Sequence, residues 1–276
     1  MKELTLRELQ LACLDIAKEI DKVCRENDIN YSLAYGSLIG AVRHKAFVPW
    51  DDDIDIVMPR PDYEKFKKIF KSDKYIFLDS SLSDDCYIAF GRVCDVTDTE
   101  DKSLCPWHGK SIKTGVFVDI FPLDAAPEKE EDFAAQYEEL HRRYDYMVRV
   151  RATKANASDA FNLHAHLRIL RHKLRDLDKL NADAPSMMRE FREMMTADEY
   201  GADPYLAQKG CANDPCFRFR LSELKDTMPM KFEDTELMVP VNYDRVLTKL
   251  FGNYMQLPPE EDRKPAQHRS FRYYWK

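Results

Sequence analysis

Long apolar runs, paired cysteines and an excess of positive charge are all missing from this sequence of 276 residues. No segment approaches the roughly 18 apolar residues of a membrane-spanning helix, and the first residues lack the apolar stretch of a secretory signal. The 42 Lys and Arg are outnumbered by 49 Asp and Glu, for a net charge of −7. This balance argues against bulk nucleic-acid binding. We therefore expect a protein that is made and kept in the cytoplasm.

The seven cysteines form an odd set without a C-x-x-C pair. This excludes the usual disulfide framework and the ribbon type of zinc site, so buried free thiols are expected. The alternative is a zinc clip that joins Cys94, Cys105 and His108 to a distant cysteine, and their irregular spacing gives it little support.

The composition that remains, 44% hydrophobic and 12% aromatic, is that of an ordinary globular protein. The length fits one large domain or a core with a helical appendage, because single cores stop growing near roughly 250–300 residues. The sequence texture divides the chain into a mixed α/β core over 1–126, a mainly helical region over 127–230 and a C-terminal segment over 231–276 that packs back on the core.

Helices and strands alternate in the first part of the chain. A capping box at Thr5 and Glu8 predicts the start of an amphipathic helix over about 6–27. Further strand-like runs and helical segments follow, and Pro122 is expected to end the last of the strands. Strands are expected at 31–35, 53–58, 75–78, 87–93 and 116–121, and helices from 38 and at 62–71, 128–151, 160–180 and 243–251.

The most distinctive local pattern is the run Trp50-Asp51-Asp52-Asp53-Ile54-Asp55-Ile56. Like charges this close repel unless cations or donors neutralise them. On a strand, Asp53 and Asp55 point to one face with Cα atoms about 6.6 Å apart, which suits hard divalent cations, while Asp52 points elsewhere. The alternative is a solvated acidic loop, which the interleaved isoleucines disfavour.

Two further patterns accompany the acidic run. Gly36-Ser37 lies between a predicted strand and a predicted helix, where backbone N–H groups and the helix dipole form an anion site. Asp119 is a single acid in the apolar run 115–121 and needs a partner if it is buried. A metal ion or an arginine in the core satisfies that need, and both interpretations stay open.

The order Gly-Ser, Asp-x-Asp on a strand and one later Asp resembles the nucleotidyltransferase (polymerase-beta-like) superfamily. Residues 35–45, 47–56 and 118–124 are more specifically similar to the LicD family. Val239-Pro240, Tyr243-Asp244, residues 251–260 and His268 are similar to that family's C-terminal signature. The resemblance implies a nucleotidyltransferase core sheet with flanking helices and a helical insertion.

The resemblance also implies an activity. LicD proteins transfer phosphocholine from CDP-choline to sugars of teichoic acid, lipopolysaccharide or capsule, and related fukutin-like enzymes transfer ribitol phosphate from CDP-ribitol. Another CDP-linked alcohol such as glycerol or ethanolamine, nucleotidyl transfer with pyrophosphate leaving, and a non-catalytic nucleotide-binding module are the alternatives. In such a system the acceptor glycan is either free or lipid-linked.

The expected metal ligands are Asp53, Asp55 and Asp119, in a two-metal site for Mg²⁺ or Mn²⁺. Asp51 or Asp52 either orients and deprotonates the acceptor hydroxyl or is simply solvated at the surface. With the three ligands, these two residues complete the predicted catalytic set.

The predicted substrate-binding residues begin with Gly36 and Ser37. Arg43, His44 and Lys45 follow them and either clamp the diphosphate or form a solvated basic turn. Arg92, on a predicted strand, is either another phosphate contact or the partner of an acid.

Aromatic residues supply the remaining candidates. Trp50, Tyr35 and Trp107 either line a choline or cytidine pocket or pack in the core. The C-terminal tail 268–276 is basic and aromatic. It is either a peripheral contact with the inner face of a membrane or a frayed end.

Overall fold

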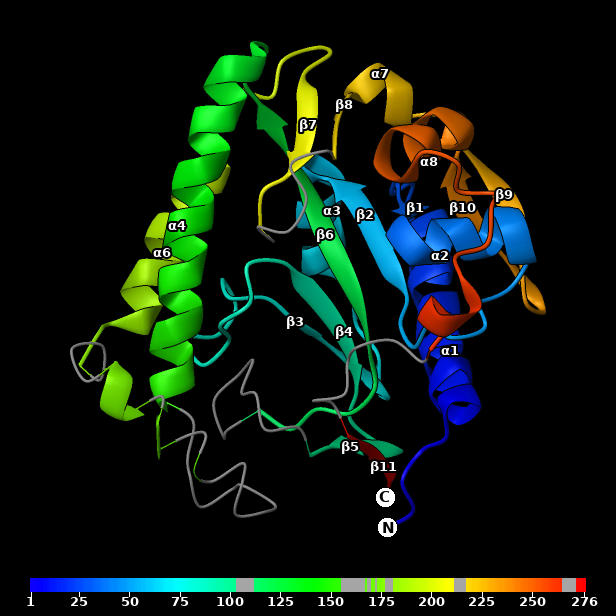
Figure 1. The fold of residues 1–276 in the computed structure, drawn as a ribbon, viewed down its shortest axis with the longest axis horizontal. Coiled ribbons are helices and arrows are strands. Elements are labelled where there is room, and N and C mark those ends of the chain that lie inside the picture. The colour runs from blue at the N-terminus through cyan, green and yellow to red at the C-terminus, as the bar shows by residue number, and fades with distance from the viewer. Residues whose placement is uncertain are drawn as a thin grey trace.

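The computed structural model describes residues 1–102, 112–154, 167, 170–171, 173–176, 181–210, 217–264 and 272–276. The protein is a mixed α/β fold built on a curled seven-stranded sheet (Figure 1). Five strands lie in the order β1-β2-β6-β4-β3, and β7 and β8 extend the sheet from β6. The mixed α/β class expected from the sequence is confirmed.

The longest strand, β6 (Phe117–Ala126), organises the sheet. It runs parallel to β2 (Asp55–Pro59) and antiparallel to β4 (Gly91–Asp95) and β7 (Tyr205–Gln208). The outer strands are β1 (Ser32–Leu33), β3 (Tyr75–Leu78) and β8 (Arg218–Arg220).

Pro122 does not end β6, contrary to expectation. The β4 pairing stops at Ile120 and the β7 pairing begins at Leu123, so Pro122 falls in the gap between them. The N–H of Asp119 points toward β2. Because N–H directions alternate along a strand, the nitrogen of residue 122 points to the opposite side, into that gap. A missing donor at this position therefore costs no ladder hydrogen bond.

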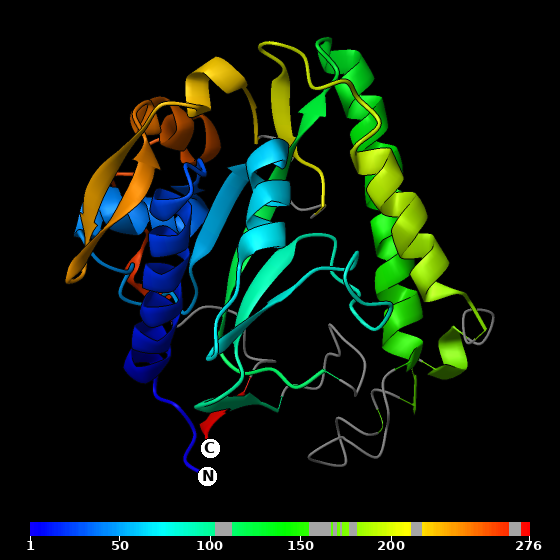
Figure 2. The same cartoon turned by 180° about the vertical axis from the view of Figure 1, so that it is seen from behind.

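Two helices cover the face of the sheet that Figure 2 shows. Helix α1 (Leu6–Glu26) begins with the predicted Thr5 and Glu8 capping box and buries an apolar stripe that includes Ile16 and Ile20. Helix α3 (Arg60–Ile69) follows β2 directly and buries Tyr63 and Phe66. Together they form one side of the main hydrophobic core.

The region 127–230 begins with long helices and continues with short strands and one short helix. Helices α4 (Glu130–Lys154) and α6 (Ala184–Met195) lie side by side at the edge of the molecule far from α1 (Figure 1). Strands β7 and β8 then return to the core sheet, and the sequence analysis did not predict them. The division of the chain at 127 and 230 stays a prediction. The described residues at 167, 170–171 and 173–175 are helical, as expected for 160–180.

The C-terminal part packs against the first helices and β1. It contains α7 (Leu221–Leu224), the hairpin of β9 (Thr227–Phe232) and β10 (Thr235–Pro240), α8 (Tyr243–Phe251) and the short helix η4 (Glu260–Asp262). Helix α8 has the predicted bounds. Strand β10 packs beside β1, and α8 packs beside α2.

The last strand, β11 (Tyr273–Trp275), pairs with β5 (Thr99–Asp101) next to the N-terminus. The two chain ends accordingly lie side by side in Figure 1. Tyr273 is buried, so this part of the tail is a paired strand rather than a frayed end, and its ring does not face a bilayer. His268 lies outside the described residues.

The structure also bears on the cysteines and on membrane insertion. Cys13, Cys24, Cys86 and Cys94 are buried free thiols, as expected. Cys105 and His108 of the alternative zinc clip lie outside the described residues. Among the described helices, none has both the length and the apolar character needed to cross a bilayer.

Candidate active site

Sheet register brings the predicted acids together. Asp55 opens β2 and stands directly beside Asp119 on the parallel strand β6. The N–H of Asp119 donates to the carbonyl of Ile54 at 3.2 Å. Two acids 64 positions apart in the sequence are therefore neighbours on one sheet.

Arg92 occupies the other side of Asp119. It stands opposite Asp119 on β4, and its Nε and Nη2 donate to the two carboxylate oxygens at 2.6 and 3.0 Å. The guanidinium is buried and lies 3.4 Å from the centre of the Phe117 ring. Of the two interpretations for Arg92, the structure shows the partner of an acid. The metal-ligand role of Asp119 stays a prediction.

The acidic run is not a single strand. Residues 51–54 are irregular, and β2 begins only at Asp55, so the prediction that Asp53 and Asp55 share a strand is wrong. Instead Asp51, Asp52 and Asp53 turn toward one another, each with a carboxylate oxygen within 4.8 Å of the others. We call these three acids, with Asp55 and Asp119, the carboxylate cluster.

The electrostatics of the carboxylate cluster fit a divalent cation. The pKa of Asp55 is raised well above its ordinary value, first by burial and then by the negative charges of Asp53, Asp119 and Asp51. Arg92 offsets this shift only in part. All the donors are hard carboxylate oxygens, which Mg²⁺ and Mn²⁺ prefer, so the donor set matches the predicted cofactor.

Gly36 and Ser37 hold the acids from the other side. They lie inside the first turn of α2 (Tyr35–Ile39), not ahead of a helix as expected, because β1 is only two residues long. The N–H of Asp55 donates to the buried hydroxyl of Ser37 at 2.9 Å. A Cβ at Gly36 would lie 2.3 Å from Oδ2 of Asp51. Any residue larger than glycine at position 36 would therefore displace the Asp51 carboxylate.

Gly36→Ala should lower activity about a hundredfold, because the new methyl group must displace the Asp51 carboxylate and small displacements at a reacting centre are costly. The helical backbone itself accepts alanine, so thermal unfolding should change little. The matched control is Gly201→Ala, where an added Cβ has nothing within 4 Å. Steady-state kinetics beside thermal unfolding of both variants tests this, and full activity of Gly36→Ala would contradict it.

A pocket of about 810 Å³ opens beside the cluster. Gly36, Arg43, Trp50 and Asp51 line one wall, and residues of the C-terminal segment, from Phe251 to Lys264, line the other. This pocket is the space that the structure offers to a substrate next to the acids.

The other predicted substrate residues are placed differently. His44 lies edge-on to Trp50, and burial together with Arg43 lowers its pKa. Lys45 is exposed and does not line the pocket. The Tyr35 ring packs against Phe121 and Phe217, so Tyr35 follows the core interpretation. Trp107 lies outside the described residues.

Arg43 ties the two walls of the pocket together. It follows α2 in the π-helical turn η1 (Gly40–His44). Its Nη1 donates to the carbonyl oxygens of Tyr254 at 2.6 Å and of Gln256 at 3.2 Å. Burial, with the nearby charge of Arg263, lowers its pKa. Arg43 therefore positions the C-terminal wall, a role that the motif alone did not reveal.

Two residues of α1 were missed by the sequence analysis. Gln10 is buried and its Nε2 donates to the carbonyl of Asp51 at 2.8 Å. Cys13 lies under the cluster, with Sγ 3.5 Å from the carbonyl of Phe117. The available signal was a polar Gln10 on the side of α1 that faces the core.

Comparison with known proteins identifies the family of this site. The family model described as LicD/FKTN/FKRP, nucleotidyltransferase domain, matches residues 28–166. The chain belongs to the LicD family. The match includes both strands of the cluster and the Gly36-Ser37 turn, so the geometry described above lies within the region that defines the family.

Individual relatives extend the similarity. The chain is 30% identical over 272 residues to the lipopolysaccharide cholinephosphotransferase LicD of Haemophilus influenzae, covering 96% of this chain and 97% of the relative. Shorter matches are to uncharacterized proteins of Rickettsia typhi, 33% identical over 66 residues, and of Rickettsia prowazekii, 36% over 52 residues. These cover 24% and 19% of this chain and 21% and 20% of the relatives. LicD similarity thus includes the helical region and the C-terminal wall of the pocket.

Proposed function

We propose that this LicD-family protein is a transferase that moves phosphocholine from CDP-choline to a sugar hydroxyl of a cell-surface glycan. The observation that carries the proposal is the alignment with the Haemophilus cholinephosphotransferase over 96% of the chain. Lipopolysaccharide, named for that relative, is the first acceptor to test, ahead of teichoic acid and capsule. We place the reaction in the cytoplasm, at the inner face of the membrane.

We further propose that residues 1–126 form a nucleotidyltransferase-type core. Three features support it: acids at corresponding positions of parallel strands β2 and β6, a Gly-Ser turn hydrogen-bonded to the first strand, and a family description that names this domain. The segment 231–276 completes the pocket from the opposite side.

In this proposal Asp53, Asp55 and Asp119 hold Mg²⁺ or Mn²⁺. Bound there, the cations neutralise charge on the diphosphate and on the attacking and leaving oxygens. The raised pKa of Asp55 supports the assignment. It shows that burial and the neighbouring carboxylates disfavour the charged form of Asp55 when no cation is bound.

The protein side chains then orient the two substrates. The acceptor hydroxyl attacks the phosphorus distal to cytidine, a new P–O bond forms to the sugar, and the bond to CMP breaks. Asp51 or Asp52 takes the proton of the attacking hydroxyl. Trp50, in the pocket wall, offers its ring face to the quaternary ammonium of choline.

Arg43→Ala should raise the KM for the donor about tenfold, because two hydrogen bonds from a charged group fix the C-terminal wall of the pocket. The turnover number should fall much less. Lys45→Asn is the control: it removes an equal charge from an exposed side chain, and asparagine tolerates the left-handed backbone there (φ 58°). Donor KM values of the two variants test this. An unchanged KM for Arg43→Ala would show that Arg43 does not contribute to donor binding.

Calorimetric and thermal-shift binding with Mg²⁺ tests the proposed donor. CDP-choline is compared with CDP-ribitol, CDP-glycerol, CDP-ethanolamine and CTP. A ligand at 100 times its Kd should add about 2.7 kcal/mol of apparent stability. Preference for CDP-choline is the expected result. Preference for another CDP-alcohol would keep the mechanism and replace the cargo, whereas no binding by any of them would favour a non-catalytic module.

A further inference from the structure

Three leucines of the helical region are exposed in one stripe. Leu167, Leu170 and Leu174 are helical and have 55%, 38% and 70% of their surfaces accessible. Spacings of three and four residues place them within one narrow arc of the helix. Leu174 is the most exposed large apolar side chain in the described part of the chain. We call these residues the leucine stripe.

Basic residues flank the leucine stripe on both sides. At about 100° per residue, Arg171 and Arg175 fall along one margin and Lys173 beyond the other. Arg171 is exposed and Lys173 is half-buried. Arg175 is also exposed, and its Nη2 lies 2.9 Å from the buried carboxylate of Asp176. An apolar stripe with cationic margins is the pattern of a helix that lies in a bilayer interface.

We propose that the leucine stripe and its basic margins dock this protein on an anionic phospholipid membrane. The leucines reach the acyl boundary while Arg171 and Lys173 contact lipid phosphates. Charge complementarity favours this occupant: the protein as a whole carries a net charge of −7, whereas the leucine stripe has cationic margins that an anionic lipid surface attracts. Within the tail, the Tyr273 ring does not supply the contact, because it is buried in β11.

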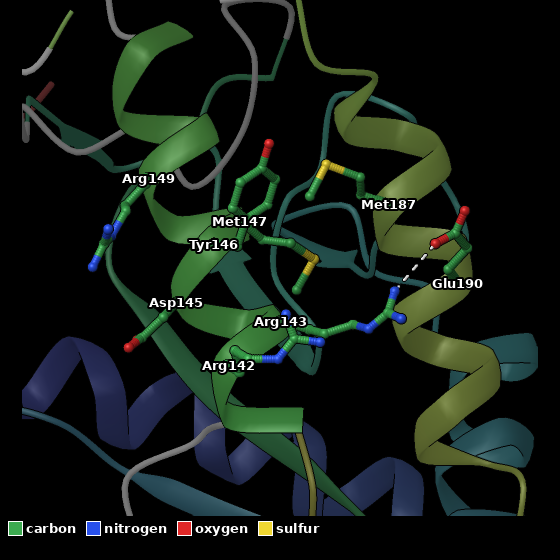
Figure 3. A pocket seen from close by; sticks show the side chains of 8 residues that line it. All are labelled: Arg142, Arg143, Asp145, Tyr146, Met147, Arg149, Met187 and Glu190. Atoms are coloured by element: carbon green, nitrogen blue, oxygen red, sulfur yellow. Dashed lines mark hydrogen bonds and ion pairs between the residues drawn. The ribbon is translucent and has the colours of Figure 1, made fainter. Parts of the chain in front are cut away.

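This surface is distinct from a cavity in the helical region. That cavity, of about 580 Å³, lies between α4 and α6, and an Arg143 to Glu190 ion pair of 3.4 Å spans the two helices (Figure 3). Its lining contains none of the leucines. The proposed membrane contact is therefore made by the leucine stripe, and the cavity takes no part in it.

Vesicle co-sedimentation of the full chain tests the docking surface. The vesicles are phosphatidylcholine alone, or phosphatidylcholine and phosphatidylglycerol in equal parts. The wild-type protein should bind the mixed vesicles and not the neutral ones. Leu170→Ser with Leu174→Ser should weaken binding at least about tenfold. Arg171→Gln with Lys173→Gln should weaken it about 25-fold, because each cation near an anionic surface strengthens binding about fivefold.

The matched control is Leu11→Ser with Leu82→Ser, two leucines that are 44% and 57% exposed elsewhere. It should bind vesicles like the wild-type protein. Equal binding by the stripe variants, or no binding by the wild-type protein, would overturn the proposal. A stripe substitution that changes the oligomeric state in light scattering while vesicle binding persists would also overturn it, in favour of a protein interface. Because vesicle binding needs neither donor nor turnover, its failure is distinguishable from failure of the proposed transferase activity.

Discussion

Asp55→Asn should abolish transfer, with kcat lower by about a thousandfold or more, without destabilising the metal-free protein. The loss follows because a half-buried carboxylate that we propose as a metal ligand is replaced by a neutral amide, and metal stabilisation is worth several kcal/mol. Stability is retained or increased because the substitution removes a negative charge that Asp53, Asp119 and Asp51 oppose.

The measurement combines Mn²⁺ affinity, turnover and thermal unfolding in the presence of a chelator. Asp53→Asn should show the same loss of activity and of metal affinity. Asp15→Asn, on the exposed side of α1, is the control for charge alone. If Asp53→Asn and Asp55→Asn fold and keep full activity, the metal assignment is wrong.

Asp119→Asn should differ from these two variants by also lowering the free energy of unfolding, by about 3–5 kcal/mol. The reason is Arg92, whose buried guanidinium binds both oxygens of Asp119 and would lose its negative partner. Urea denaturation of the metal-free protein measures the difference. A stability equal to that of Asp55→Asn would contradict the pairing.

A double-mutant cycle isolates the pair. Arg92→Met combined with Asp119→Asn removes both charges, so the double variant should be more stable than the sum of the single changes predicts, by about 0.5–3 kcal/mol. Additive effects would show that the two side chains do not stabilise each other. Activity of Asp119→Asn must be measured well below its unfolding temperature, since otherwise unfolding imitates a catalytic defect.

Several elements were predictable because one local signal determined each of them. The capping box begins α1 where it was expected, and α8 has the expected bounds. Strand β3 likewise matches its apolar run between turn residues. In these segments periodicity, capping and tertiary packing agree, so local sequence suffices.

Other elements depend on partners that local sequence does not reveal. Strands β7 and β8 are only four and three residues long: β7 pairs with β6, and β8 pairs with β7. Pro122 lies within β6 because two neighbouring pairings leave a gap there. Strand β4 begins at Gly91, four residues after its predicted start at 87, because pairing with β3 and β6 sets its register.

The candidate site shows the same division. Residue type and order identified Asp53, Asp55 and Asp119 as a group, and β2 and β6 do place Asp55 beside Asp119. The positions of Asp53 and the partners of Arg43 and Arg92 depended on tertiary contacts. A guanidinium beside a motif looks the same in sequence whether it binds phosphate, a carboxylate or, like Arg43, a backbone carbonyl.

The most direct test of the central claim is ³¹P NMR of the products formed from CDP-choline, Mg²⁺ and a lipopolysaccharide acceptor. The account predicts that CMP appears in step with a phosphodiester on the glycan, that a chelator stops both signals, and that Asp55→Asn gives neither. Absence of CMP under conditions in which CDP-choline binds, or release of pyrophosphate from CTP in its place, would contradict phosphocholine transfer by this protein.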